Sequence, residues 1–216
     1  MGQSDIPFSK AARNLGVLFD SQLALKEEVN KYRHLAYLET RRVGSVRRYL
    51  SSEDTKILVS SLLLSRLDYR NALLAGSPQV LLDKIQTASN CSAGLIFKAP
   101  KSAHITPLLY DLHWLPISSL IQYKIALISF NVVSAPAPPY LSELFRLYSP
   151  RSLRSASDTR IFRVPRMGRR TLWERSSQYI GPVIWTSFPL SLSGRNSSSL
   201  TSSNSKLKTH LFSSAY

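Results

Sequence analysis

The stretch His104–Leu141, HITPLLYDLHWLPISSLIQYKIALISFNVVSAPAPPYL, decides the fold class. It is apolar and aromatic, prolines divide it into pieces, and it contains few reactive side chains. Thr106 as a cap followed by Pro107 predicts a helix start, because proline at the first helical position loses no hydrogen bond. Trp114–Pro116 predicts a turn. The run Ile117–Val133 predicts a core helix, because polar residues interrupt it and it is shorter than the roughly 20 residues that a membrane span needs.

Three further helices are predicted before this stretch. Apolar residues at a spacing of three and four predict a helix over Leu23–Leu50 and another over Gln79–Phe97. Between them, Ser51 followed by Asp54 predicts a capped helix start, and this helix is expected to run to about Leu74. Apolar residues surround most of its circumference, so we expect it to be deeply buried. The apolar positions are Leu25, Val29, Tyr32, Ala36 and Val43 in the first helix, Ile57, Leu58, Val59, Leu62, Leu63, Leu64 and Leu67 in the second, and Leu81, Ile85, Ala88, Ser92 and Leu95 in the third.

The two ends of the chain are predicted to be less regular. Leu15–Asp20 is short and apolar and predicts a strand. Beyond residue 150 the sequence is rich in arginine: Ile161–Val164 predicts a short strand, Ser191–Ser205 a loop, and Lys206–Phe212 a closing helix. The predicted fold is therefore mainly α, a helical bundle with minor β structure. Its predicted parts are a strand within 1–20, a helical domain at 21–148 and a basic segment at 149–216.

The composition predicts a polyanionic partner. The chain has 216 residues, and its 28 Lys and Arg against 13 Asp and Glu give a formal net charge of +15. Such an excess is typical of proteins that bind nucleic acid. The single cysteine, Cys91, excludes an intrachain disulfide, and one cysteine with four scattered histidines excludes a zinc finger. The polar N-terminus has no apolar signal core, so we expect an intracellular protein, nuclear or cytoplasmic, with no membrane partner.

No catalytic pattern is found in the sequence. Two-metal nucleotidyl transfer needs carboxylates that converge on the metal ions, and the chain has no Asp-Asp pair. The lone Asp20 is interpreted as a turn or cap residue. His113, beside Trp114, is interpreted as a packed or partly exposed histidine. Because nucleophile-elbow and phosphate-loop patterns are also missing, we predict no catalytic residue, no metal ligand, no cofactor and no small-molecule substrate.

Arginine clusters are the positive functional signal. One cluster lies near the end of the first predicted helix, and another flanks Gly168 in an irregular segment. The planar guanidinium fork of arginine can bind a phosphate through two hydrogen bonds. These residues are candidates for contact with nucleic-acid phosphates, and the pattern does not predict base-specific recognition. The candidates are Arg41, Arg42, Arg47, Arg48, Arg166, Arg169 and Arg170.

A series of short motifs, in fixed order and spacing, extends over nearly the whole chain. In order they are Leu15-Gly16-Val17-Leu18-Phe19-Asp20, Arg41-Arg42, Arg48-Tyr49-Leu50, Ser65-Arg66-Leu67-Asp68-Tyr69, Asn71-Ala72-Leu73, Asn90-Cys91, Leu95-Ile96-Phe97, His113-Trp114-Leu115-Pro116, Tyr123-Lys124, Pro139-Tyr140-Leu141, Arg169-Arg170, Trp185 with Pro189, and Lys206-Leu207-Lys208. With these motifs the chain resembles the reverse transcriptases of LINE-type, non-LTR retrotransposons of the Jockey-like kind, downstream of their polymerase core.

The resemblance implies a specific part of such an enzyme. Residues 1–20 would be a remnant strand of the palm edge and 21–148 the helical thumb, which grips the template–primer duplex; fingers, palm and endonuclease would be absent. The chain departs from the pattern in four places. Arg70 replaces a small residue, Gly94 and Leu120 replace arginines, and Pro136 stands in place of a glycine turn. Gly94 in a helix should cost about 1 kcal/mol relative to alanine.

Three functional hypotheses follow. The first is a fragment of an RNA-directed DNA polymerase that binds the backbone of RNA or an RNA–DNA duplex and is not itself an enzyme. The second is a helical scaffold or protein-interaction module with incidental positive charge, in which Trp173, Trp185 and Tyr140 form an exposed interface. The third is a translated remnant without function.

Overall fold

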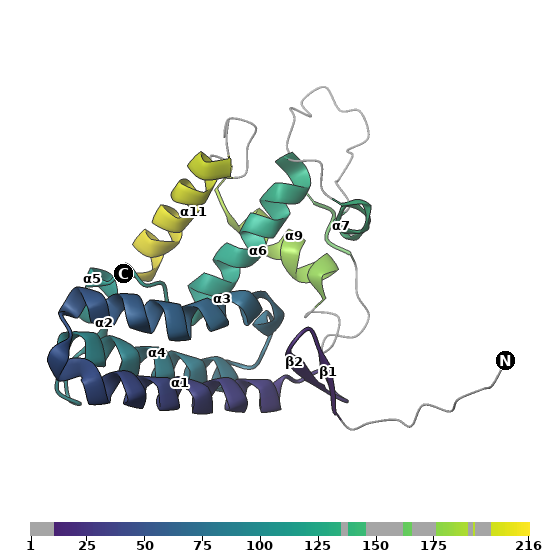
Figure 1. Ribbon diagram of the computed structural model, residues 1–216. Helices are drawn as coiled ribbons and strands as arrows, with labels where there is room; N and C mark the ends of the chain where they lie inside the picture. The colour runs from purple at the N-terminus through teal and green to yellow at the C-terminus, as the bar shows by residue number, and fades with distance from the viewer. Residues whose placement is uncertain (1–10, 135–137, 146–161, 166–175, 190–191, 193–199) are drawn as a thin grey trace, which may run out of the picture. The chain divides into compact units, whose positions relative to one another are not determined.

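The computed structural model describes residues 11–134, 138–145, 162–165, 176–189, 192 and 200–216 (Figure 1). These residues are mainly helical, with a two-stranded antiparallel hairpin at the N-terminal end, which confirms the predicted fold class. The chain forms two compact units. The first comprises Met1–Arg70 and Ser77–Leu109, and the second comprises Asn71–Gly76 and Tyr110–Tyr216. Residues from both sides of the predicted division at position 148 thus belong to the second unit.

The hairpin of the first unit is longer than the single predicted strand. β1 (Ala11–Asn14) pairs with β2 (Val17–Asp20), so that Ala11 lies opposite Asp20. Leu15 and Gly16, expected within the strand, form the connection instead, both with positive φ (47° and 81°). Two such residues are typical of the tight turns that match the twist of a hairpin.

Asp20 stands at a turn, as predicted. Its side-chain Oδ1 accepts a hydrogen bond from the backbone N–H of Ala24 (2.7 Å), and its carbonyl accepts one from Leu23 (3.0 Å). Both hydrogen bonds stabilise the connection between β2 and the first helix. The carboxylate therefore has a local structural role.

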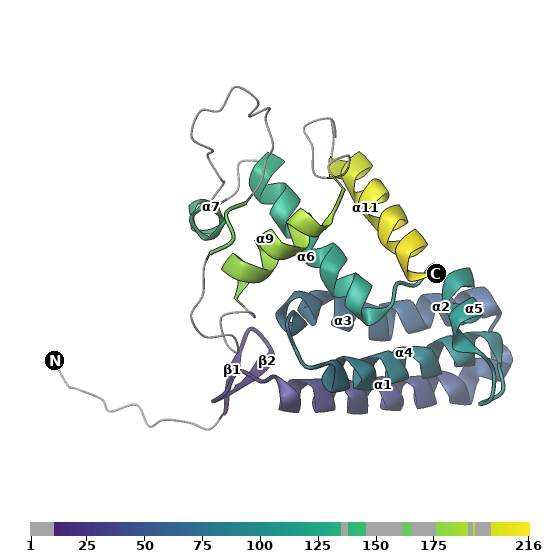
Figure 2. The ribbon, with the colours of Figure 1, turned by 180° about the vertical axis from the view of Figure 1, so that it is seen from behind.

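Two long helices, α1 (Lys26–Val46) and α4 (Gln79–Phe97), lie side by side in the first unit (Figures 1 and 2). The bounds of α4 are those predicted. A short 3₁₀ turn, η1 (Arg47–Tyr49), continues α1. The apolar faces predicted for both helices are buried, except that Leu95 is half-buried. The hydroxyls of Thr40 and Ser92, 3.0 Å apart, also link the two helices.

A helical segment of changing geometry lies between them. It consists of α2 (Ser52–Val59), a π-helical turn η2 (Ser60–Leu64), α3 (Ser65–Arg70) and a 3₁₀ turn η3 (Asn71–Leu74). Ser51 and Asp54 form the predicted capping box: the Ser51 hydroxyl accepts from the Asp54 N–H (3.1 Å), and Asp54 accepts from the Ser51 N–H (3.3 Å).

The prediction that this segment is deeply buried on most sides is wrong. Val59, Leu63 and Leu67 are buried, but the side chain of Ile57 is 59% exposed. Within the first unit α2 packs against α1 and α4, and of its own residues only Thr55 and Val59 are buried. An apolar run without a clear periodicity did not reveal which residues these would be.

A buried carboxylate joins the hairpin to the helices. Glu28, on α1, is buried; its Oε2 accepts a hydrogen bond from the Leu18 N–H (2.9 Å), and its Oε1 pairs with Nη1 of Arg70. Nη2 of Arg70 also donates to the carbonyl of Gly16 (3.2 Å). Arg70, the last residue of α3, thus holds the hairpin turn and α1 together, and Glu28 connects α1 to β2.

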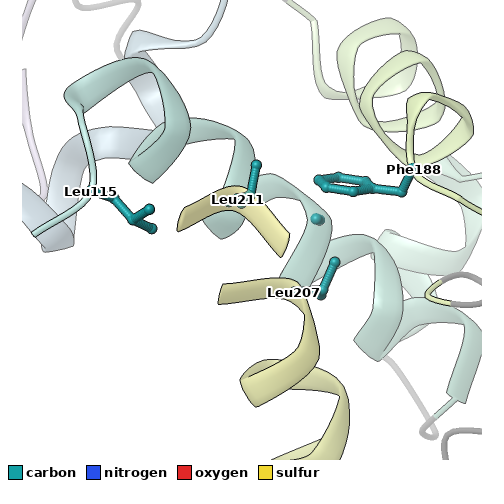
Figure 3. Packing of buried hydrophobic residues seen from close by; sticks show 5 residues of the cluster. Leu115, Phe188, Leu207 and Leu211 are labelled. Carbon is teal, nitrogen blue, oxygen red and sulfur yellow. The ribbon is translucent and has the colours of Figure 1, made fainter. Parts of the chain in front are cut away.

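The second unit is built around α6 (Ile117–Ser134), close to the predicted helix. It packs against α9 (Ser177–Ser187) and α11 (Leu200–Ala215). Figure 3 shows Leu115, Phe188, Leu207 and Leu211, which form one hydrophobic cluster with Ala126. A second cluster consists of Phe130, Phe145, Phe162 and Trp185.

The remaining elements differ in part from the prediction. α5 (Ile105–Asp111) begins one residue before Thr106, which therefore lies in the first turn and is not the cap. α7 is Pro139–Leu144. α11 begins at Leu200, inside the predicted serine-rich loop, and Ser203 is buried on that helix. Of the predicted strand Ile161–Val164, the described residues show a single bridge at Phe162 followed by irregular chain. Residues 135–137 lie outside the described residues.

In the part of the chain that the structure describes, no helix combines the length and the apolar character needed to cross a bilayer.

Candidate nucleic-acid interface

Three of the predicted arginines are exposed where α1 ends. Arg41, Arg42 and Arg48 all reach solvent. Nη1 of Arg42 lies 3.1 Å from Oε1 of Glu39, which is buried, but the Arg42 side chain stays 73% exposed. The guanidinium of Arg48 lies over the ring of Tyr49, 4.6 Å from its centroid. Because about two helical turns separate Arg41 from Arg48, both positions lie on the same side of the helical segment.

Arg47, predicted with this cluster, is buried. The residue is 6% exposed, and its guanidinium donates to the carbonyls of Leu50 (2.7 Å), Ile96 (2.7 Å) and Leu95 (3.1 Å) and to the hydroxyl of Ser52 (3.2 Å). The last carbonyls of a helix have no partner within the helix, and here the arginine supplies one for α4. The side chain is therefore committed to the fold, and we assign it a structural role.

The sequence contained a signal for this burial. Arg47 follows Val43 by four residues and so continues the apolar face of α1 that includes Ala36. A cation on that face has to find hydrogen-bond acceptors in the interior. The prediction placed Arg47 with its neighbouring arginines at the surface and did not take this periodicity into account.

The C-terminal end of α4 adds basic residues that the prediction missed. Lys98 has a left-handed conformation (φ 52°), and the Ala99 N–H donates to the carbonyl of Gly94 (2.9 Å), which are features of a Schellman ending. Lys98 and Lys101 are exposed, and Phe97 is 39% exposed. The sequence had suggested only a helix stop here. The aromatic residue beside a lysine was the available signal.

Arg166, Arg169 and Arg170 lie outside the described residues, as does Trp173. Trp185, expected to be exposed, is buried at 2% exposure in the aromatic cluster of the second unit, so that expectation is wrong. Its indole packs with Phe130 and Phe162 because α9 lies against α6.

His113 and Cys91 each contact an aromatic side chain. His113 is exposed, has positive φ and stacks on Phe212 with 5.5 Å between ring centroids. Cys91 is exposed and not in a disulfide, and its thiol lies against the hydroxyl of Tyr37. Among the described residues, no group of three or more His, Cys, Asp or Glu side chains could hold a metal ion.

Two tyrosine hydroxyls are used inside the fold. Burial raises the pKa of Tyr32 well above its usual value, and its hydroxyl donates to the carbonyl of Leu63 (3.2 Å). Burial also raises the pKa of Tyr216, whose hydroxyl donates to the carbonyl of Trp114 (2.6 Å). Both hydroxyls keep their protons at neutral pH and stabilise packing.

Compared with known proteins, the chain matches no family model, no curated protein and no solved structure. Its function is therefore inferred from the placement and chemistry of its own residues.

Proposed function

We propose that the chain is a thumb-like remnant of a LINE-type reverse transcriptase that binds the phosphates of RNA or an RNA–DNA duplex without catalysing polymerisation. The motif series supports the proposed origin. The exposed group Arg41, Arg42 and Arg48 at the end of α1 carries the proposed binding. The proposal leaves Arg47 out of the contact surface, because its hydrogen bonds hold α1 to α4.

The local charge supports phosphate binding. Lys98 and Lys101, at the end of α4, belong to the same unit and bring two more exposed ammonium groups. α2 begins soon after Tyr49, and its first turn carries two acidic residues, Glu53 and Asp54. The carboxylate of Asp54 is engaged in the capping box. A formal net charge of +15 adds long-range attraction for polyanions, which decreases with ionic strength.

The proposed lack of polymerase activity rests on the sequence. Nucleotidyl transfer needs carboxylates that converge on two metal ions, and the chain has no Asp-Asp pair to supply them. Extension of a primed template by the isolated chain would refute this part of the proposal.

A salt titration of binding tests the proposed contact. Three phosphate contacts predict that the logarithm of the association constant decreases with the logarithm of salt concentration by about 0.7 to 0.9 per contact. Arg41→Glu, Arg42→Glu and Arg48→Glu together should weaken the binding of duplex and single strand and reduce this slope.

A matched control separates the site from the overall charge. Lys31→Glu, Lys206→Glu and Lys208→Glu reverse three exposed charges elsewhere and change the net charge equally. If both triple variants weaken binding to the same extent, the charge acts without a defined site. If neither reversal weakens binding, the scaffold hypothesis is favoured.

A further inference from the structure

Two pairs of adjacent basic and aromatic residues lie where the long helices of the first unit end. Arg48 and Tyr49 close the segment that continues α1, and Phe97 and Lys98 close α4. The Tyr49 residue is 73% exposed although Arg48 lies over its ring, so much of the ring surface is open to solvent. Phe97, a fully apolar side chain, is 39% exposed. Neither aromatic residue is buried in the core.

Arg47 links the backbone segments that carry the two pairs. It directly precedes Arg48, and its guanidinium donates to the carbonyl of Ile96, which directly precedes Phe97. A second hydrogen bond reaches the carbonyl of Leu50, which directly follows Tyr49. The backbone on both sides is therefore tied to one buried guanidinium. The aromatic residues project from a fixed scaffold and not from a long loop.

Two other exposed tyrosines of the described chain, Tyr69 and Tyr110, have structural uses that Tyr49 lacks. The hydroxyl of Tyr69 donates to the carbonyl of Leu15 (3.4 Å). The ring of Tyr110 packs against that of Phe212, with 5.1 Å between centroids. The ring of Tyr49, in contrast, contacts the guanidinium of Arg48. Nucleobases stack both on the plane of an arginine guanidinium and on aromatic rings.

We propose that this end of the first unit, the platform formed by Arg48, Tyr49, Phe97 and Lys98, binds unpaired nucleotides. Bases stack on the two rings while Arg48, Lys98 and the neighbouring Arg41 contact phosphates. In a duplex the bases stack on each other, so their faces cannot reach a ring on the protein surface, whereas the bases of a single strand can. The inference rests on the proposed nucleic-acid function and names the form of nucleic acid that this site takes.

Fluorescence anisotropy on the full chain tests the platform. The probes are a labelled oligouridine of about 12 nucleotides, within the range of known single-strand site sizes, and a fully paired RNA duplex of equal length. Tyr49→Ala and Phe97→Ala should each weaken oligouridine binding at least about fivefold and leave duplex binding within about twofold. Tyr49→Phe, which keeps the ring, should retain binding. Tyr140→Ala, at another exposed tyrosine (64%), is the matched control and should change neither affinity.

The outcomes separate this inference from the function on which it rests. If the arginine reversal weakens binding but Tyr49→Ala and Phe97→Ala do not, phosphate binding stands and the platform is refuted. Equal loss for both probes on Tyr49→Ala also refutes it, since stacking of unpaired bases predicts a selective loss. If the arginine reversal has no effect, the proposed phosphate contact itself fails. Circular dichroism of each variant checks that the helices are intact.

Discussion

Replacing Arg70 by methionine tests whether the buried carboxylate organises the first unit. The change removes the ion pair with Glu28 and the hydrogen bond to the carbonyl of Gly16, and keeps most of the apolar stem. Removing one partner of a buried ion pair costs about 3–5 kcal/mol, because the other charge is left uncompensated. The Glu28 side chain is only 5% exposed, but it keeps the hydrogen bond from Leu18, and Arg70 itself is 24% exposed. We therefore expect a loss near the lower limit, about 3 kcal/mol.

Urea denaturation of a four-protein cycle gives the magnitude. The proteins are the wild type, Arg70→Met, Glu28→Gln and the double variant. Because glutamine is neutral, the double variant should be more stable than Arg70→Met, and the coupling energy should exceed about 1 kcal/mol. Arg42→Met is the comparison variant, since the Arg42 side chain is 73% exposed against 24% for Arg70. It leaves the largely buried Glu39 carboxylate without its partner, but it should cost less than Arg70→Met because water still reaches the cation in the native protein. An equal cost for Arg70→Met and Arg42→Met, or a coupling energy near zero, would contradict the reasoning.

Three further predictions concern stability, each measured by denaturation. Gly94→Ala should raise the free energy of unfolding by about 0.5–1 kcal/mol, because a Cβ there meets no atom within 4 Å. Gly181→Ala should lower it by about 1–3 kcal/mol, because its Cβ would overlap the ring of Phe145; a neutral result would contradict that packing. Tyr32, whose pKa is raised by burial, stays protonated in the folded state while it ionises above about pH 10 in the unfolded chain. Stability should therefore decrease by up to about 1.4 kcal/mol per pH unit above that pH. Tyr32→Phe should reduce this dependence, and an unchanged alkaline profile would refute the assignment.

The features that the sequence predicted well depend on signals within a few residues. The capping box of Ser51 and Asp54 is a local exchange of hydrogen bonds, and the face of α4 repeats at helical spacing. Strand β1, Ala11–Asn14, has no apolar alternation, and its pairing with β2 became visible only in the structure.

The features that were missed depend on distant partners. Trp185 is buried because α6 covers it, which nothing near residue 185 encodes. At the candidate site, the exposed cluster of arginines could be predicted, but the assignment of Arg47 to the interior required its acceptors on α4, almost 50 residues away in sequence. Periodicity pointed to that face, whereas the chemistry of the side chain pointed to solvent.

The short segment Asn71–Gly76 belongs to the second unit although it lies in the middle of the sequence of the first. Leu74 and Ala75 are buried, and η3 packs against α6, which begins 43 residues after Leu74. During synthesis all residues of the first unit can therefore have left the ribosome before α6, the helix against which η3 packs, is complete. In that interval the side chains of Leu74 and Ala75 stay in contact with water. Packing of η3 against α6 then closes a loop that contains Ser77–Leu109 of the first unit. The two units are thus interleaved in folding order, and neither corresponds to a contiguous peptide.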